Sequence, residues 1–306
     1  MSTINHIVAV DIGATKAAIA IVSNELEVIK KTEVPTGSNS DIWIGIENAT
    51  KELISLGNFQ IDGIGIASAG PINLQTGSIS PVNIPTWREF LIVEHFAKLF
   101  GTSNIVLHGD AVALAHAEYK IGAGKGCQNM LGMVVSTGIG GGLILGGKLF
   151  TGVTGNASYF GHHTISFEGK QCTCGRIGCV ETYASGPKMV EHALSIGWQS
   201  EQHDFRKLAE DARSGNRFAI ESIDHGTLAL ANAIVNVLGI LDINTVVIGG
   251  GVSQAGEIYW APLRKHVLHE AKFAGFLEEI DLRPAKLDRD AGLLGAALGV
   301  LDNERE

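Results

Sequence analysis

The chain has 306 residues, of which 45% are hydrophobic and 18% are charged, so it is long enough to form two domains with sizeable cores. Its formal net charge of −9 argues against a surface that binds a nucleic-acid backbone, although backbone amides and a few local cations can still hold an anion such as ATP. No apolar run reaches membrane-spanning length without interruption, and the start of the chain is too short and polar for a signal peptide, so we expect a cytoplasmic protein with no membrane and no nucleic-acid partner.

Two predicted β-hairpins share one plan of strand, polar turn and strand. The first joins strands at 7–10 and 17–22 through a turn that holds Asp11, Gly13, Ala14, Thr15 and Lys16, and the second joins strands at 131–135 and 143–145 through a turn that holds Thr137, Gly138 and Gly140. Either turn alone reads as an ordinary β-turn, but the pair indicates an internal duplication with one loop per domain. Backbone N–H groups and threonine hydroxyls of such loops can surround a β- or γ-phosphate, and Asp11 would hold its Mg²⁺ directly or through water.

Asp110 follows a predicted strand at 105–107 and begins an alanine-rich stretch of helical composition. A carboxylate at this junction can serve as the N-cap of the helix, and it can also accept a proton from an attacking hydroxyl group in a cleft. Upstream, the spacing predicts a helix over 41–56 and a buried strand over 61–66. The glycine-rich segment 122–126 is the predicted crossing between domains.

Three of the four cysteines lie within eight residues, at Cys172, Cys174 and Cys179. Three thiolates and one imidazole complete a tetrahedral zinc shell, whereas a disulfide cannot use three thiols evenly; three reduced structural cysteines are the alternative. The fourth ligand is His162 or its neighbour His163, which the sequence alone does not separate. A closed four-ligand shell leaves no position for water, so this Zn²⁺ is expected to build a loop that presents Glu181 rather than to catalyse.

Downstream of this motif the composition predicts helices over 187–196, 205–215 and 218–241. A buried strand at 246–249 then ends in a glycine run that includes Gly250 and Gly251, and a last helix rich in small residues begins at 290.

The run from Gly161-His162 through Cys172-x-Cys-Gly-x-x-Gly-Cys179-x-Glu181 resembles the signature of the ROK family of sugar kinases and repressors, and the match extends over nearly the whole chain. The resemblance implies a two-domain α/β fold of the actin-like ATPase type (ribonuclease H-like, shared with hexokinases), with ATP between related domains. We expect an N-terminal domain of 1–120 plus 291–306 and a larger C-terminal domain of 121–290 that carries the zinc knuckle. We also expect a homodimer or a higher homo-oligomer.

The family pattern assigns roles residue by residue. It implies that Asp110 is the catalytic base, that Gly70, Asn83, His162 and Glu181 contact the sugar, and that Gly250 and Gly251 lie on the adenosine side. Ala14 replaces the second glycine of the usual Asp-x-Gly-Gly-Thr loop. Tyr159 stands where the family commonly has Glu, and Gly109 stands where it has Asn, so two partners of sugar hydroxyls are missing. These departures indicate an altered sugar preference more than a loss of activity.

The favoured function is therefore an ATP-dependent kinase of the C6 hydroxyl of a hexose, with a weak preference for an N-acyl or amino hexose such as N-acetylmannosamine. A glucokinase is the runner-up, and the choice of ATP or polyphosphate as donor stays open. A sugar-responsive repressor would need a DNA-binding helix-turn-helix, and the few residues before the first strand leave no room for one. A polymerising or chaperone-type ATPase would not explain the zinc knuckle beside Glu181.

Overall fold

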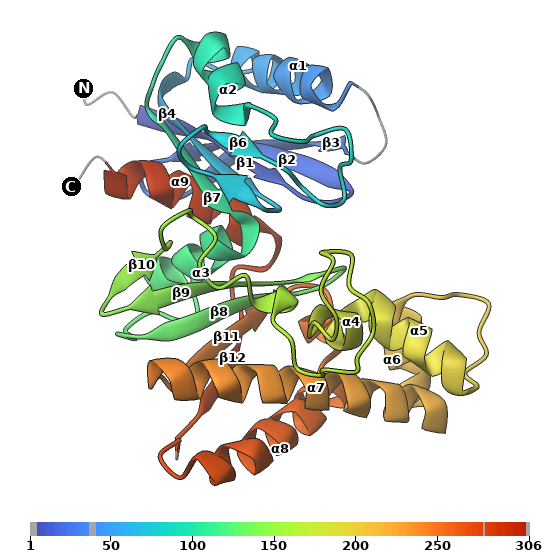
Figure 1. The fold of residues 1–306 in the computed structure, drawn as a ribbon. Coiled ribbons are helices and arrows are strands. Elements are labelled where there is room, and N and C mark those ends of the chain that lie inside the picture. The colour runs from blue at the N-terminus through green and yellow to red at the C-terminus, as the bar shows by residue number, and fades with distance from the viewer. Residues whose placement is uncertain (1–4, 37–40, 278, 304–306) are drawn as a thin grey trace. The chain divides into compact units, whose positions relative to one another are not determined.

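The computed structural model describes residues 5–36, 41–277 and 279–303. Its internal contacts divide the chain into two units (Figure 1). Unit 1 comprises Met1–Gly122, Leu149–Ala157 and Arg289–Glu306, and unit 2 comprises Ala123–Lys148 and Ser158–Asp288. Each unit has its own mixed sheet and its own cluster of buried apolar side chains, so each is a folded domain in its own right.

Unit 1 is built on a five-stranded sheet in the order β3-β2-β1-β4-β7. Its strands are β1 (Asn5–Ile12), β2 (Lys16–Ser23), β3 (Val28–Pro35), β4 (Gln60–Ser68) and β7 (Ile105–Gly109), with a small hairpin of β5 (Ile72–Asn73) and β6 (Ser78–Ile79). The helices are α1 (Ile42–Ser55), α2 (Ile92–Phe100), α3 (Asp110–Ile121) and α9 (Ala291–Asn303). Strands β1, β4 and β7 run parallel, whereas β2 pairs antiparallel with both β1 and β3.

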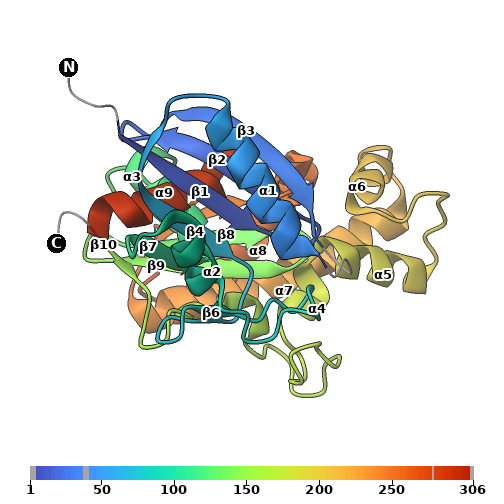
Figure 2. The same cartoon turned by 90° about the horizontal axis from the view of Figure 1, so that it is seen from above.

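Helices cover both faces of this sheet. Seen from above, α1 lies along β2 and β3 and α2 lies toward β7, while α3 and α9 lie on the other face (Figures 1 and 2). Ile64 and Ile66 of β4 are buried in the core with Ile46 of α1 and Phe96 of α2. The alternate residue Gly65 faces α9, where an added Cβ would lie 2.0 Å from the carbonyl oxygen of Ala296. Helix α9 therefore packs closely on the sheet of unit 1.

Unit 2 carries a second five-stranded sheet in the order β10-β9-β8-β11-β12. Its strands are β8 (Met130–Val135), β9 (Ile139–Leu145), β10 (Lys148–Phe150), β11 (Thr245–Gly249) and β12 (Asp281–Pro284). The helices are α4 (Glu181–Ala184), α5 (Gly186–Ile196), α6 (Phe205–Arg213), α7 (Arg217–Leu241) and α8 (Glu257–Ala274), with single 3₁₀ turns η1 (Phe160–His162) and η2 (Ser253–Ala255). A third 3₁₀ turn, η3 (Asp288–Asp290), begins at the last residue of unit 2 and ends in the next segment of unit 1. Both predicted hairpins are present, as β1-β2 and β8-β9.

Helix α7 supplies much of the core of unit 2. By length and composition it is the one helix, among the described residues, that could also cross a membrane. Its buried side chains, which include Ile223, Leu230, Ile234 and Leu238, belong instead to the cluster that the sheet and α8 complete. We therefore describe α7 as a core helix of this unit.

Candidate active site and metal centre

The parallel strands of unit 1 bring several predicted site residues to one edge of the sheet. In the registers of these strands, Asp11 and Ile12 of β1 lie beside Ala67 and Ser68 of β4, which in turn lie beside His108 and Gly109 of β7. Ligands of open α/β sheets bind at the carboxyl ends of such strands. Asp11, Gly70 just beyond β4, Gly109 and Asp110 therefore belong to the edge where a ligand of this unit would be expected.

Asp11 and Asp110 interact electrostatically at this edge. Burial and, after it, the charge of Asp110 raise the pKa of Asp11 and Lys16 lowers it, and together they bring it to about 7. The carboxylate of Asp11 packs against the start of α9, because a Cβ added to Gly292 would lie 2.2 Å from its Oδ2 atom. Two carboxylates in such surroundings favour a bound cation, so the residues present fit the Mg²⁺ expected at Asp11.

Asp110 is the first residue of α3 rather than its N-cap, which is Gly109. The N-cap expected at Asp110 therefore lies one residue earlier, at Gly109. The backbone N–H of Ala111 donates to Asp110 Oδ1 at 2.7 Å. This local bond fixes one carboxylate oxygen at the amino end of α3, where the helix dipole favours the ionised form.

The first predicted phosphate loop is the turn between β1 and β2. Gly13 N–H donates to the carbonyl oxygen of Lys16 at 3.0 Å and closes the turn, while Thr15 accepts from Thr36 N–H through its backbone carbonyl at 3.0 Å. Thr15 and Lys16 are exposed and Ala14 is half-buried. The ammonium group of Lys16 lies 2.6 Å from Glu33 Oε1 on the neighbouring strand.

Asn83 lies exposed in the loop between β6 and α2. The sequence reasoning missed what holds this loop. Arg88 Nη1 donates to the carbonyl oxygens of Pro81, Ile84 and Trp87 at 2.8, 3.1 and 3.0 Å. No pattern in the sequence marks Arg88, because an arginine that binds its own loop looks like any exposed cation.

The second predicted phosphate loop is the turn between β8 and β9 in unit 2. Thr137 is exposed at its tip, and Gly140 already belongs to β9. Ser136 N–H donates to the carbonyl oxygen of Gly138 at 2.9 Å. Gly250 approaches the end of β8 closely, since its φ is +93° and an added Cβ would lie 2.4 Å from the carbonyl oxygen of Val135. A Cβ added to Gly251 would lie 3.8 Å from Ser136 Oγ. The structure thus brings the glycine run and this loop together.

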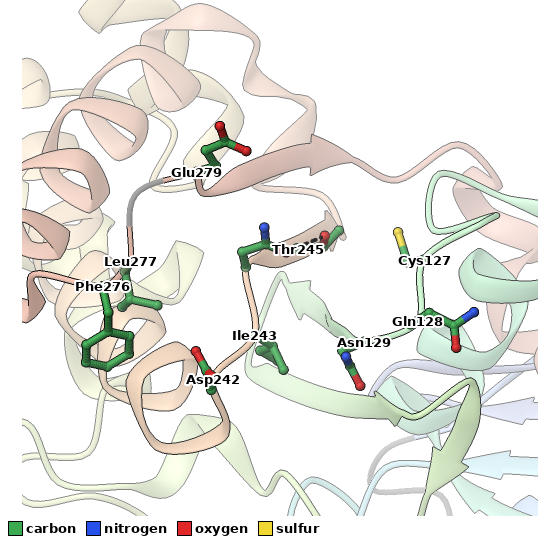
Figure 3. A pocket seen from close by; sticks show the side chains of 10 residues that line it. Cys127, Gln128, Asn129, Asp242, Ile243, Thr245, Phe276, Leu277 and Glu279 are labelled. Carbon is green, nitrogen blue, oxygen red and sulfur yellow. Dashed lines mark hydrogen bonds between the residues drawn. The ribbon is translucent and has the colours of Figure 1, made fainter.

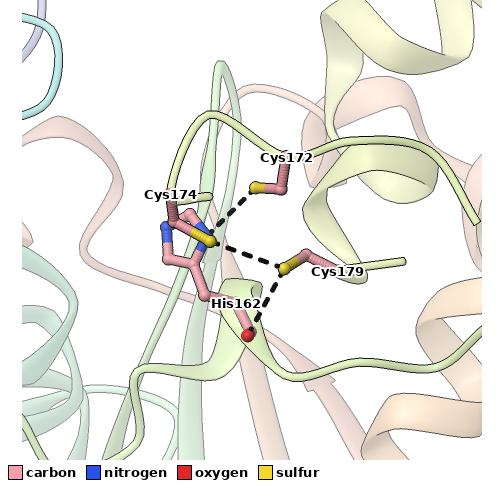
Figure 4. Close-up of side chains that lie close together, drawn as sticks. All are labelled: His162, Cys172, Cys174 and Cys179. Atoms are coloured by element: carbon pink, nitrogen blue, oxygen red, sulfur yellow. Dashed lines mark hydrogen bonds between the residues drawn. The ribbon is translucent and has the colours of Figure 1, made fainter. Parts of the chain in front are cut away.

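Four ligand atoms gather at the end of η1 and in the loop that leads from it to α4. The side chains of His162, Cys172, Cys174 and Cys179 point toward one another, and their ligand atoms all lie within 4.8 Å of one another (Figure 4). The separation is 3.7 Å between the sulfurs of Cys174 and Cys179 and 3.4 Å between Cys172 Sγ and His162 Nδ1. A tetrahedral ion with Zn–S bonds of about 2.3 Å places its sulfurs about 3.8 Å apart, whereas a disulfide needs about 2 Å. The cluster therefore fits Zn²⁺ and not a disulfide.

The thiols themselves favour a metal. Burial and, after it, the neighbouring cysteines Cys174 and Cys172 together raise the pKa of Cys179 to about 12. A thiol in such surroundings becomes a thiolate at neutral pH only when a cation binds it. Of the two adjacent histidines, His162 lies in the cluster through Nδ1, while His163 Nδ1 contacts the carbonyl oxygen of Phe160 at 2.7 Å.

Tyr159 and Glu181 border this cluster. The Tyr159 ring lies 4.5 Å from the His162 ring between centroids, tilted by 34°, and 43% of the residue is exposed. Glu181 begins α4, two residues after Cys179, and its Oε2 accepts from Ile139 N–H at 2.8 Å. The structure therefore joins the metal cluster, Glu181 and the second predicted phosphate loop within unit 2.

A separate pocket of about 550 Å³ lies at the opposite ends of β8 and β11 (Figure 3). Cys127, Gln128 and Asn129 lie toward one side of it, and Phe276 and Leu277 lie toward the other. None of the residues that line it was predicted as a site residue. Because it opens at the amino ends of the strands, it is not the expected position of an active site in an α/β unit.

Comparison with known proteins gives one consistent result. The sequence model of the ROK family matches residues 7–303. A glucokinase of Thermotoga maritima is 32% identical over 95% of this chain and 96% of its own length, and an N-acetylmannosamine kinase of Citrobacter koseri is 35% identical over 95% and 97%. The crystal structure of a ROK family glucokinase from Streptomyces griseus, in complex with glucose and AMPPNP, superposes with a TM-score of 0.82 at 29% identity over 96% of this chain and 98% of that one. The predicted fold class is confirmed.

Proposed function

Because the chain belongs to the ROK family, we propose that it is a sugar kinase that transfers the γ-phosphate of ATP to the C6 hydroxyl of a hexose. Kinases of glucose and of N-acetylmannosamine match it over almost its entire length. The observation that carries the proposal is the position of Asp110, which begins α3 at the same sheet edge as Asp11. A phosphoryl transfer to a hydroxyl group needs such a base beside a carboxylate that can hold a metal ion.

In this mechanism Asp110 accepts the proton of the attacking hydroxyl group. Its Oδ1 atom accepts from Ala111 N–H at 2.7 Å, which holds the carboxylate at the start of α3. Asp11 would hold Mg²⁺, which neutralises charge on the phosphates when it is bound. The backbone amides of the two glycine-containing turns, at 13–16 and 137–140, bind phosphate oxygens, and Gly250 and Gly251 bind the nucleoside side.

The sugar is bound by Gly70, Asn83, His162 and Glu181 in this proposal. His162 uses Nδ1 in the metal cluster, so only its Nε2 atom can contact a hydroxyl group. Zn²⁺ would supply no chemistry of its own, because four protein ligands close its shell; it keeps the loop between Cys172 and Glu181 folded. Reduced thiols in this cluster suit the cytoplasm, where we place the protein. A homodimer or a higher homo-oligomer remains part of the proposal.

The choice of sugar in this proposal depends on Tyr159 and Gly109. A phenol and a bare backbone cannot copy the hydrogen bonds that a carboxylate and an amide make with hydroxyl groups. A site without such a partner discriminates weakly by that hydroxyl, and the half-exposed ring of Tyr159 offers apolar surface to an N-acyl methyl group. We therefore favour an N-acyl or amino hexose such as N-acetylmannosamine. Glucose is the second candidate, because glucokinases are among the matching relatives.

The test is ADP release, measured over a panel of hexoses and hexosamines with ATP or polyphosphate as donor. We expect kcat/KM to be higher for an N-acyl or amino hexose than for glucose. Tyr159→Glu should shift this ratio toward glucose, and Phe150→Glu, an exposed aromatic residue in β10, is the matched control that should not. A strong preference of the wild type for glucose, unchanged by Tyr159→Glu, would replace this proposal by a glucokinase.

A further inference from the structure

One side chain connects the second phosphate loop to the loop that holds the metal cluster. Ile139 follows the tip of the phosphate loop, and its N–H group donates to Glu181 Oε2 at 2.8 Å. The same oxygen packs against the tip itself, because a Cβ added to Gly138 would lie 2.7 Å from it. Glycine at this position therefore makes room for the carboxylate of Glu181.

The other contacts of this loop are made by backbone atoms. Gly186 N–H donates to the carbonyl oxygen of Ser136 at 2.9 Å, and Val252 N–H donates to that of Val135 at 3.1 Å. Ser136 N–H closes the turn onto Gly138 at 2.9 Å. These bonds fix the first half of the loop and do not depend on a side chain. In the second half, Ile139 pairs with β8, and both Gly138 and Ile139 contact the side chain of Glu181, so a substitution at Glu181 removes that contact and leaves the backbone bonds in place.

The segment before α4 fixes Glu181 in turn. Cys179 is fully buried in the metal cluster two residues earlier, and Val180 N–H donates to the carbonyl oxygen of His163 at 3.1 Å. The carbonyl oxygen of Ile139 is also enclosed, since a Cβ added to Gly161 would lie 2.1 Å from it. Ile139 thus lies between Glu181 on its N–H side and the turn that carries His162 on its carbonyl side.

We propose that Glu181 is a positioning residue for the phosphate loop as well as a sugar ligand. Its Oε2 atom holds Gly138 and Ile139 in place, and its Oε1 atom remains for a sugar hydroxyl group. The inference rests on the proposed function in one respect, namely that this loop binds phosphate. It adds that the sugar and the nucleotide are linked through one carboxylate, so that each should strengthen the binding of the other.

The experiment measures binding of Mg²⁺-AMPPNP by calorimetry in the absence of any sugar. Glu181→Ala should weaken binding roughly tenfold, because a hydrogen bond from a backbone N–H to a charged acceptor is lost. Glu181→Gln should bind within about twofold of the wild type, because its amide oxygen still accepts from Ile139 N–H. Gly138→Ala should weaken binding as Glu181→Ala does, since the new methyl group displaces the carboxylate. Gly239→Ala is the matched control; it lies in α7, where an added Cβ meets only Phe276 at 3.9 Å.

A residue that binds only the sugar would leave this measurement unchanged. Undiminished nucleotide binding by both Glu181→Ala and Gly138→Ala overturns the inference and leaves the proposed function intact. An equal loss in Glu181→Gln and Glu181→Ala overturns the assigned hydrogen bond. If Glu181→Ala does not fold, Glu181→Met, which keeps the length of the side chain but offers only a weak acceptor to Ile139 N–H, takes its place. A wild-type protein that binds no Mg²⁺-AMPPNP refutes the proposed function together with this inference.

Discussion

The proposed role of Asp110 as the general base can be tested by a substitution that removes only its ability to accept a proton. Asn in place of Asp110 still accepts from Ala111 N–H through Oδ1, so the start of α3 should keep its local bond. The amide cannot act as a base at neutral pH. We expect Asp110→Asn to lower kcat by about 10²–10⁴-fold while the sugar affinity changes little, because general-base catalysis contributes on that order. Steady-state kinetics give kcat, and a separate sugar-binding titration gives the affinity for the sugar.

Asp204→Asn is the matched control for that substitution. Asp204 is the N-cap of α6, and its Oδ1 atom accepts from Lys207 N–H at 2.9 Å, a role that Asn also fills. Asp204 has no part in the proposed chemistry, so its variant should retain full turnover. Near-normal kcat in Asp110→Asn would show that another group takes the proton.

At the scale of the element, the metal loop makes a prediction that needs no substrate. Protein purified without chelator should carry about one zinc per chain, and Cys174→Ser should lose it because one missing thiolate opens the shell. Cys127→Ser is the control, since Cys127 lies outside the cluster and should be dispensable for the metal. Elemental analysis that finds no zinc in the wild type, or full zinc in Cys174→Ser, would contradict the assignment.

The packing of α9 on α3 in unit 1 is supported by an ion pair at the end of α9. Asp302 Oδ2 lies 3.0 Å from His116 Nε2 and 2.9 Å from Lys120 Nζ. The side chain of Asp302 is only 31% exposed, so the charge is partly shielded from water. We expect Asp302→Asn to lower the free energy of unfolding by about 1–2 kcal/mol in urea titrations at neutral pH. Glu52→Gln on the exposed face of α1 should change it by less than about 0.5 kcal/mol.

The same pair predicts a pH dependence. The hydrogen bond from His116, with further contributions from Lys120, holds the pKa of Asp302 below its usual range. A carboxyl group whose pKa falls on folding stabilises the protein above the pKa of the unfolded chain, about 3.9, and loses that contribution as the pH falls through the folded value. The difference in stability between wild type and Asp302→Asn should therefore be present above about pH 4 and shrink as the pH falls below it. A difference that grows as the pH falls below about 4 would show that the carboxylate does not stabilise this helix pair.

For the molecule as a whole, elements with a regular apolar pattern were easier to predict from the sequence than elements without one. The two hairpins, the strand at 61–66 and the helices at 187–196 and 218–241 follow from apolar periodicity, and the structure contains all of them. Helix α8 was not predicted, since Pro262 lies inside it and interrupts the pattern. Strand β12 was missed because it is short, only partly buried and ends at Pro284.

The contacts of the candidate site were less predictable than its residues. The cluster of cysteines follows from spacing, but His162 and His163 are neighbours and only the folded loop shows which one joins the sulfurs. The hydrogen bond between Glu181 and Ile139 joins residues that lie 42 positions apart, and no local sequence pattern predicts it. Long-range contacts of this kind depend on the packing of whole elements, which a local sequence pattern does not encode.

The central claim is that the chain phosphorylates the C6 hydroxyl of a hexose, and its most direct test is a comparison of two sugars that differ only there. The best sugar of the panel and its 6-deoxy analogue are each incubated with Mg²⁺ and ATP, and ADP and the phosphorylated product are quantified. We predict equal amounts of ADP and of a 6-phosphate with the first sugar, and only the background without sugar with the analogue. Equal ADP release with both, or phosphate found on another hydroxyl group, would contradict the account.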